Sequence, residues 1–232
     1  YFAFFSAHAM FHLLAVMPAF ALLIAVTGVA VVIALRHQAL AIAVLGLIGG
    51  FTTPLMLQSD LPNLPVLLGY LILLSAGMMA IALYRQWPLL VWLSLTGSVG
   101  IVLTTLAMNV WLANEWIIAL AGVTILFILY STAIFGYTVR HRLEATALEA
   151  GGLFINVVIF MVEGWLIFDR LRFVKSGMAV LTIALALFYI AHIYFFFSRQ
   201  LRDRTLLTVF ASLAAASLAL TLPCLFSEAA LT

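Results

Sequence analysis

Charged residues are scarce in this chain. Asp, Glu, Lys and Arg make up only 8% of its 232 residues, whereas soluble domains contain roughly 25%. This scarcity excludes a disordered chain, a nucleic-acid-binding surface and a soluble enzyme domain, because each of these needs many polar or charged side chains. Hydrophobic residues are abundant instead, at 67%, and the mean hydropathy is +1.28. We therefore expect lipid to surround most of the side chains.

Cysteine is almost absent as well. The single Cys224 cannot form an internal disulfide, and no group of Cys and His has the spacing of a structural zinc site. The sequence also lacks the serine-hydrolase, paired-aspartate and phosphate-loop motifs of common enzymes. We therefore predict that the protein is not an enzyme, carries no cofactor and binds no nucleic acid.

Long apolar runs divide the chain into candidate membrane spans. A transmembrane helix needs about 20 apolar residues, and helices satisfy every backbone hydrogen bond within the segment, as lipid requires. We predict an all-α, polytopic transmembrane helix bundle of about nine spans, in one domain over residues 1–232. The nine segments are Tyr1–Val16, Pro18–Leu35, Ala39–Leu57, Pro65–Tyr84, Leu89–Met108, Glu115–Thr138, Thr146–Phe168, Ser176–Phe197 and Thr205–Phe226. Because the chain opens inside an apolar run without Met, we expect it to be a piece of a longer protein.

Basic residues are distributed unevenly between the two sides of this predicted bundle. Positive charge accumulates in cytoplasmic loops, so the richer side, which includes Tyr1, is expected to be cytoplasmic, with Thr232 outside. The richer side holds seven basic residues, Arg36, Arg85, Arg140, Arg142, Arg199, Arg202 and Arg204, and the other side holds three, Arg170, Arg172 and Lys175. The three outer cations lie in one turn, Asp169–Lys175, which could face lipid headgroups or a partner.

The third predicted span contains the segment Gly49-Gly50-Phe51-Thr52-Thr53-Pro54. Glycine loosens a helix, while proline removes a backbone donor and clashes with the preceding turn. Thr52 and Thr53 can bond to the freed carbonyls. One interpretation is a kinked helix that acts as a gate beside a cavity. The other is a helix that simply ends before the next loop.

This segment also carries a family resemblance. Gly49, Gly50, Phe51, Thr53 and Pro54, with Leu55, resemble the Gly-Gly-Phe-Leu-Thr-Pro-Leu signature of a bacterial multi-spanning membrane family, domain of unknown function 2339. Tyr70 and Trp87 also resemble that family, whereas Thr52 departs from its usual Leu. The resemblance implies a multi-pass protein of the bacterial inner membrane and no specific catalytic residues.

The seventh predicted span places three polar residues at intervals of seven. Glu149, Asn156 and Glu163 therefore share one helix face, with a drift of about 20° per heptad. Carboxylates are costly in hydrocarbon and usually face an interior or an aqueous path. The functional interpretation is a proton or cation relay, or a polar wall for a solute. The structural interpretation places the two glutamates near the interfaces, with Asn156 in one interhelical hydrogen bond.

His8 and His12 are weak candidates for a metal or haem site. Their spacing of four residues places them one above the other on a helix, and His192 is a possible third member. A histidine within a membrane span usually bonds to a neighbouring helix instead, so we predict no metal.

Two functions remain open from the sequence. The first is transport or flipping of a small or lipid-linked solute along Glu149, Asn156 and Glu163. The second is a scaffold or assembly subunit that packs against membrane partners or a second copy of itself. Membrane lipids are expected partners in either case.

Overall fold

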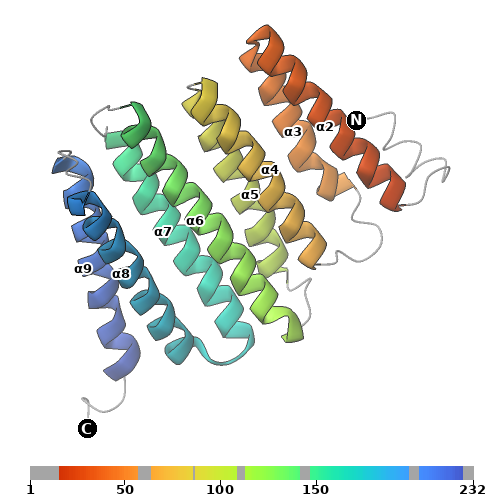
Figure 1. The fold of residues 1–232 in the computed structure, drawn as a ribbon. Coiled ribbons are helices and arrows are strands. Elements are labelled where there is room, and N and C mark those ends of the chain that lie inside the picture. Colours follow the sequence, from red (N-terminus) through yellow and green to blue (C-terminus); the bar gives the residue numbers. More distant parts are fainter. Residues whose placement is uncertain are drawn as a thin grey trace. The chain divides into compact units, whose positions relative to one another are not determined.

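The computed structural model describes residues 16–56, 64–85, 87–108, 113–141, 147–198 and 204–226. Every regular element within these ranges is a helix (Figure 1). The α-helices are α2 (Val16–His37), α3 (Leu40–Met56), α4 (Leu64–Arg85), α5 (Pro88–Ala107), α6 (Trp116–His141), α7 (Ala147–Arg170), α8 (Val174–Ser198) and α9 (Arg204–Phe226). A short 3-10 helix, Ala113–Glu115, precedes α6. The predicted all-α class is therefore confirmed.

The number of full-length spans is lower than predicted. Within the described residues, six helices, α4 to α9, are long and apolar enough to cross a membrane. The described parts of α2 and α3 contribute shorter apolar stretches, Ala25–Ala34 and Leu40–Pro54. The eight predicted segments from Pro18–Leu35 to Thr205–Phe226 each coincide with one helix, α2 to α9, while the prediction of about nine spans exceeds the six full-length spans found within the described residues. The first predicted span, Tyr1–Val16, lies almost wholly outside the described residues.

Two turns are closed in the same way. Gln38, after α2, and Arg172, after α7, have φ values of 52° and 58°, in the left-handed region. In both turns the next amide donates to a carbonyl five residues earlier, at 3.1 Å. This is the Schellman arrangement, in which glycine is the usual left-handed residue. Both positions therefore hold a side chain where glycine would fit with less strain.

The chain divides into two compact units, Tyr1–Leu126 and Phe127–Thr232. The boundary falls within α6. In unit 1, α2 packs on α3, α4 packs on α5, and α3 also contacts α4 and α5. Small residues permit these approaches, since a Cβ on Gly46 would lie 3.1 Å from the Cβ of Ala30, and one on Gly97 would lie 2.5 Å from the Phe51 ring.

In unit 2, α8 packs along α9, and α7 packs on both. Gly164 of α7 faces Leu181 of α8, because a Cβ on Gly164 would lie 2.8 Å from a Leu181 methyl group. Tyr189 and Phe210 are fully enclosed where α8 meets α9. The contact between Gly164 and Leu181 marks the register of the antiparallel helices α7 and α8.

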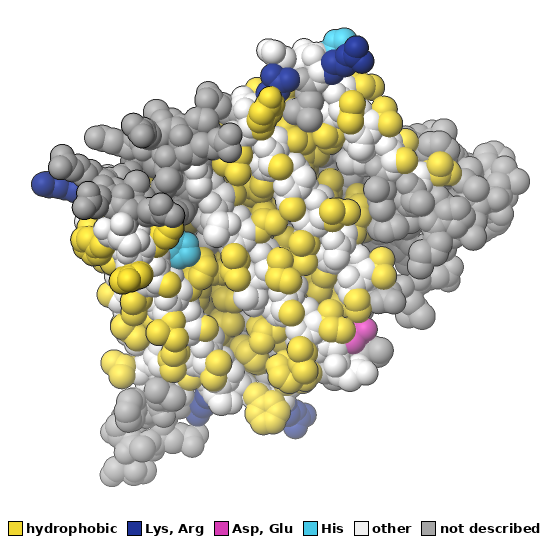
Figure 2. Space-filling model, in the orientation of Figure 1, with side chains coloured by type: hydrophobic (Ala, Val, Ile, Leu, Met, Phe, Trp, Pro, Cys, Tyr) yellow, Lys and Arg dark blue, Asp and Glu magenta, His cyan; other side chains and the backbone are white. Residues whose placement is uncertain are grey.

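The outward faces of the helices are strongly apolar. Leu45, Val180 and Leu187 are each more than 60% exposed, and Figure 2 shows hydrophobic side chains along the helices, with Lys and Arg near helix ends. Contiguous apolar surface on this scale is rare on soluble monomers. Lipid contact explains it, so the helices belong to a multi-pass membrane protein.

Candidate functional site

The polar interior of unit 2 is the candidate site. The seven-residue series lies on the continuous helix α7, as the spacing predicts. Asn156 is 3% exposed and Glu163 is 5% exposed. Glu149 is half-buried in the first turn of α7, where a carboxylate is favoured by the helix dipole. The structure therefore buries two of the three residues and places the third at a helix end.

Asn156 links α7 to α6. Its amide nitrogen donates to the carbonyl of Phe127 at 3.1 Å and to Oγ of Ser131 at 2.9 Å. Both amide hydrogens are therefore used in one interhelical contact, of the type that holds membrane helices together. This contact is the structural role that the sequence offered as an alternative for Asn156.

Aromatic rings surround this contact. The Phe127 ring stacks on Phe160 at 4.5 Å between centroids and meets Tyr189 edge-on at 6.4 Å. Tyr189 is fully buried, and its hydroxyl lies towards Ser131 without reaching hydrogen-bond geometry with a described residue. A buried hydroxyl without such a bond is uncommon and needs an explanation.

Asn156, Ser131 and Tyr189 form one polar level, which is a set of polar side chains at one height along the helices. A second polar level lies further along the same helices. Thr221 of α9 donates to Oγ1 of Thr182 on α8 at 2.9 Å, and both threonines are buried. Glu163 precedes Gly164 and Thr182 follows Leu181, so the contact of Gly164 with Leu181 places Glu163 and Thr182 at the same height along their helices. The levels are seven residues apart on α7, or about 10 Å at 1.5 Å per residue.

Four members of these levels are not predicted from the sequence, namely Ser131, Thr182, Tyr189 and Thr221. A signal was present, because Thr182 and Tyr189 are seven residues apart on one span, as Asn156 and Glu163 are on the preceding span. Antiparallel packing brings the two series into register, so that Asn156 is level with Tyr189. Only the packing of α7 on α8 could reveal that match.

The segment Gly49–Pro54 belongs to unit 1, where it forms the last part of α3. The helix continues through Pro54 and ends at Met56. Oγ1 of Thr52 donates to the carbonyls of Ile48 and Gly49, each at 3.0 Å, and Oγ1 of Thr53 donates to Gly49 at 2.9 Å.

The carbonyl that Pro54 frees is that of Gly50, since an α-helix pairs residue i with residue i−4. Neither threonine bonds to it, contrary to the expectation that Thr52 and Thr53 would bond to the freed carbonyls. The hydroxyl of Tyr70 on α4 donates to it instead, at 2.8 Å. The proline therefore creates a polar site that ties α3 to α4.

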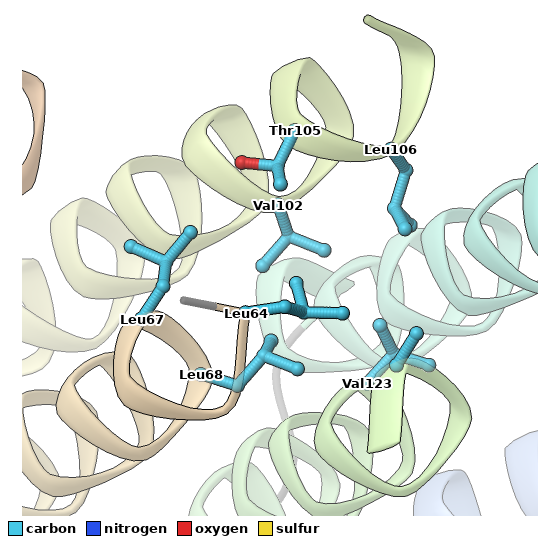
Figure 3. Close-up of a pocket in the computed structure, with 8 residues that line it drawn as sticks. Leu64, Leu67, Leu68, Val102, Thr105, Leu106 and Val123 are labelled. Carbon is cyan, nitrogen blue, oxygen red and sulfur yellow. The ribbon is translucent and has the colours of Figure 1, made fainter. Parts of the chain in front are cut away.

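A pocket in unit 1 is too small for a solute. Leucine and valine side chains of α4, α5 and α6 line it, among them Leu64, Leu68 and Val102 (Figure 3). Its volume is about 10 Å³, close to the minimum for one water molecule. We therefore assign it no binding role.

The histidines do not form a metal site in the described part of the chain. His8 and His12 lie outside the described residues. Nδ1 of His192 lies 2.9 Å from the carbonyl of Phe188, and its ring packs 4.3 Å from the Phe188 ring. Among the described residues, no group of three or more His, Cys, Asp or Glu could hold a metal ion.

Comparison with known proteins identifies the family. No curated protein and no solved structure matches the chain. The profile of a family described as "Predicted membrane protein (DUF2339)" matches residues 1–232. This match covers the whole sequence and agrees with the apolar, multi-span helices. The chain therefore belongs to the DUF2339 family of predicted membrane proteins.

Proposed function

We propose that the protein transports or flips a small or lipid-linked solute across the membrane, along the polar interior of unit 2. The observation that carries the proposal is Glu163, a carboxyl group that is 5% exposed within the membrane-spanning helix α7. An ionisable group at such a depth costs several kcal/mol and is usually kept for transport of ions, protons or substrates. In this mechanism Glu163 binds a proton or the solute.

The neighbouring groups suit this role. Glu163 is level with the pair Thr182 and Thr221, and the hydroxyl of Tyr189 lies about 10 Å further along. Hydroxyl groups both donate and accept hydrogen bonds, so they can exchange partners with a passing solute. Glu149, half-buried at the start of α7, would lie at one end of this route.

Replacement of Glu163 by Gln tests the proposal. Cells that lack the protein are supplied with the full-length wild type, Glu163→Gln or the control Glu115→Gln, which makes the same change in unit 1. Envelope lipids and exported metabolites are then measured by mass spectrometry. We expect the wild type and the control to restore any species altered by the deletion, and Glu163→Gln to fail although it folds. Full restoration by Glu163→Gln would contradict the proposal.

A membrane scaffold is the second candidate. It is favoured by Asn156, because both of its amide hydrogens are used in structural hydrogen bonds to α6. Thiol labelling separates the two functions. In a Cys224→Ser background, Thr182→Cys should react with a charged, membrane-impermeant reagent if water reaches the interior of unit 2. The lipid-facing control Val180→Cys, at a position 68% exposed, should stay unreactive because lipid excludes the charged reagent. Unreactive Thr182→Cys would favour the scaffold.

A further inference from the structure

The turn between α7 and α8 forms a hollow that the proposed transport route does not use. This turn joins the lower ends of the two helices in Figure 1. The hollow is open and has a volume of about 460 Å³. Its lining includes Asp169, Arg172, Phe173 and Lys175, and Arg170 lies beside it in the sequence. Three cations and one carboxylate therefore gather within seven residues.

The turn lies where two membrane spans end. The apolar stretch of α7 ends at Arg170, and that of α8 begins at Val174. Trp165 is 46% exposed on the last part of α7, and Phe173 is 65% exposed in the turn itself. Exposed aromatic rings at the end of a span are typical of the headgroup region of a bilayer. These positions predict that the hollow opens at the depth of the lipid phosphates.

The topology predicted from the loop charges does not account for these cations. The loop charges predict that this turn is on the outer side, and its three cations are all of the basic residues predicted there. Positive charge at cytoplasmic ends orients a membrane protein, so an outer cluster opposes that rule. Arg172 also occupies a left-handed position, φ 58°, where glycine is the usual residue. Arg172 therefore stands at a position that both the predicted topology and the backbone conformation disfavour.

We propose that this hollow binds the headgroup of an anionic phospholipid. Arg172 and Lys175 would hold the phosphate group, since both side chains line the hollow and pair well with phosphate oxygens. Asp169 would accept a hydrogen bond from a headgroup hydroxyl, which phosphatidylglycerol offers. Phe173 and Trp165 would rest against the glycerol and upper acyl region. This site is independent of the transport proposed for unit 2.

Lipid retention by the intact protein tests the proposal. The detergent-purified full chain is mixed with phosphatidylglycerol, phosphatidylethanolamine or phosphatidylcholine, and retained lipids are counted by native mass spectrometry. We expect preferential retention of phosphatidylglycerol. Arg172→Gly and Lys175→Gln should each weaken it about fivefold, the effect of one surface cation on binding to anionic lipid. Arg172→Lys should retain it.

The variants separate lost binding from lost folding. Arg172→Gly places glycine at a left-handed position, so its thermal stability should equal or exceed that of the wild type. Gln38→Gly makes the same backbone change at φ 52° in another turn and should leave lipid retention unchanged. Equal retention of phosphatidylglycerol and phosphatidylcholine, or undiminished retention by Arg172→Gly, would overturn the proposal. Displacement of the lipid by millimolar inorganic phosphate would also overturn it, because the site would then take free phosphate.

Discussion

The hydrogen bond between Tyr70 and Gly50 allows a quantitative test of how unit 1 is held together. Pro54 has no N–H, so the carbonyl of Gly50 has no donor from its own helix. The Tyr70 hydroxyl supplies one from α4 at 2.8 Å, and Tyr70 is only 7% exposed. Tyr70→Phe keeps the ring and removes the donor. The carbonyl would then be buried without a partner.

The expected loss is about 1 kcal/mol. A buried carbonyl left unpaired costs roughly 1–3 kcal/mol, whereas hydrogen bonds within membrane proteins average about 0.6 and reach about 1.7 kcal/mol. The loss of stability caused by Tyr70→Phe should depend on Pro54. In Pro54→Ala, residue 54 regains its N–H and can pair with Gly50 inside the helix. Tyr70→Phe should then cost close to nothing, which gives a coupling free energy of about 1 kcal/mol between the two positions.

Four proteins complete this measurement: the wild type, Tyr70→Phe, Pro54→Ala and the double variant. Their free energies of unfolding can be obtained from reversible SDS titrations in mixed micelles, followed by circular dichroism. Independent sites add within about 0.3–0.5 kcal/mol. A coupling below that limit would refute the assignment, because Tyr70 would then stabilise the protein by packing and not by pairing with the carbonyl that Pro54 frees.

The change in the free energy of unfolding caused by a Gly→Ala substitution should depend on the space available for the new Cβ. The same unfolding titrations measure this change. Gly97→Ala should cost about 1–3 kcal/mol, because its Cβ would lie 2.5 Å from the rigid Phe51 ring, and Gly164→Ala should cost less, because the Leu181 methyl at 2.8 Å can move. Gly77→Ala, with nothing within 4 Å, should gain about 0.5–1 kcal/mol, and a loss there would contradict the packing described. Gln38→Gly should stabilise by up to about 1 kcal/mol by relieving a left-handed side chain.

The helices could be predicted from the sequence because lipid imposes a simple rule. Each span must be apolar over a fixed length and pair its own backbone, so charge and proline mark its ends. The span predicted over Leu89–Met108 is α5, Pro88–Ala107, with proline in its favoured position at the start. Each predicted segment from Pro18–Leu35 onward coincides with one helix, and over the described residues six of these helices are long and apolar enough to cross a membrane.

The contacts between helices could not be predicted in the same way. Thr52 and Thr53 were expected to satisfy the carbonyls freed by Pro54, yet the donor is Tyr70, 20 residues from Gly50. Which residue becomes the donor depends on how α4 packs against α3, and the hydropathy pattern does not determine that packing. The same limit hid the pair Thr182 and Thr221 at the level of Glu163. Arg172 was read as part of a basic turn, and its left-handed backbone follows from the closing of α7, not from residue type.

Two of the buried tyrosines, Tyr70 and Tyr189, use their hydroxyls differently, and this difference is why we assign the proposed transport route to unit 2 and not to unit 1. Each fills its helix interface with a ring, and phenylalanine would fill the same space. In unit 1 the hydroxyl of Tyr70 has a structural task, since it pairs with the Gly50 carbonyl. In unit 2 the hydroxyl of Tyr189 forms no hydrogen bond to a described residue, although it lies towards Ser131. Burial of an unpaired hydroxyl costs free energy, and packing alone gives no reason to keep it. The proposed transport gives one, because a polar solute on its way to Glu163 would exchange hydrogen bonds with Tyr189.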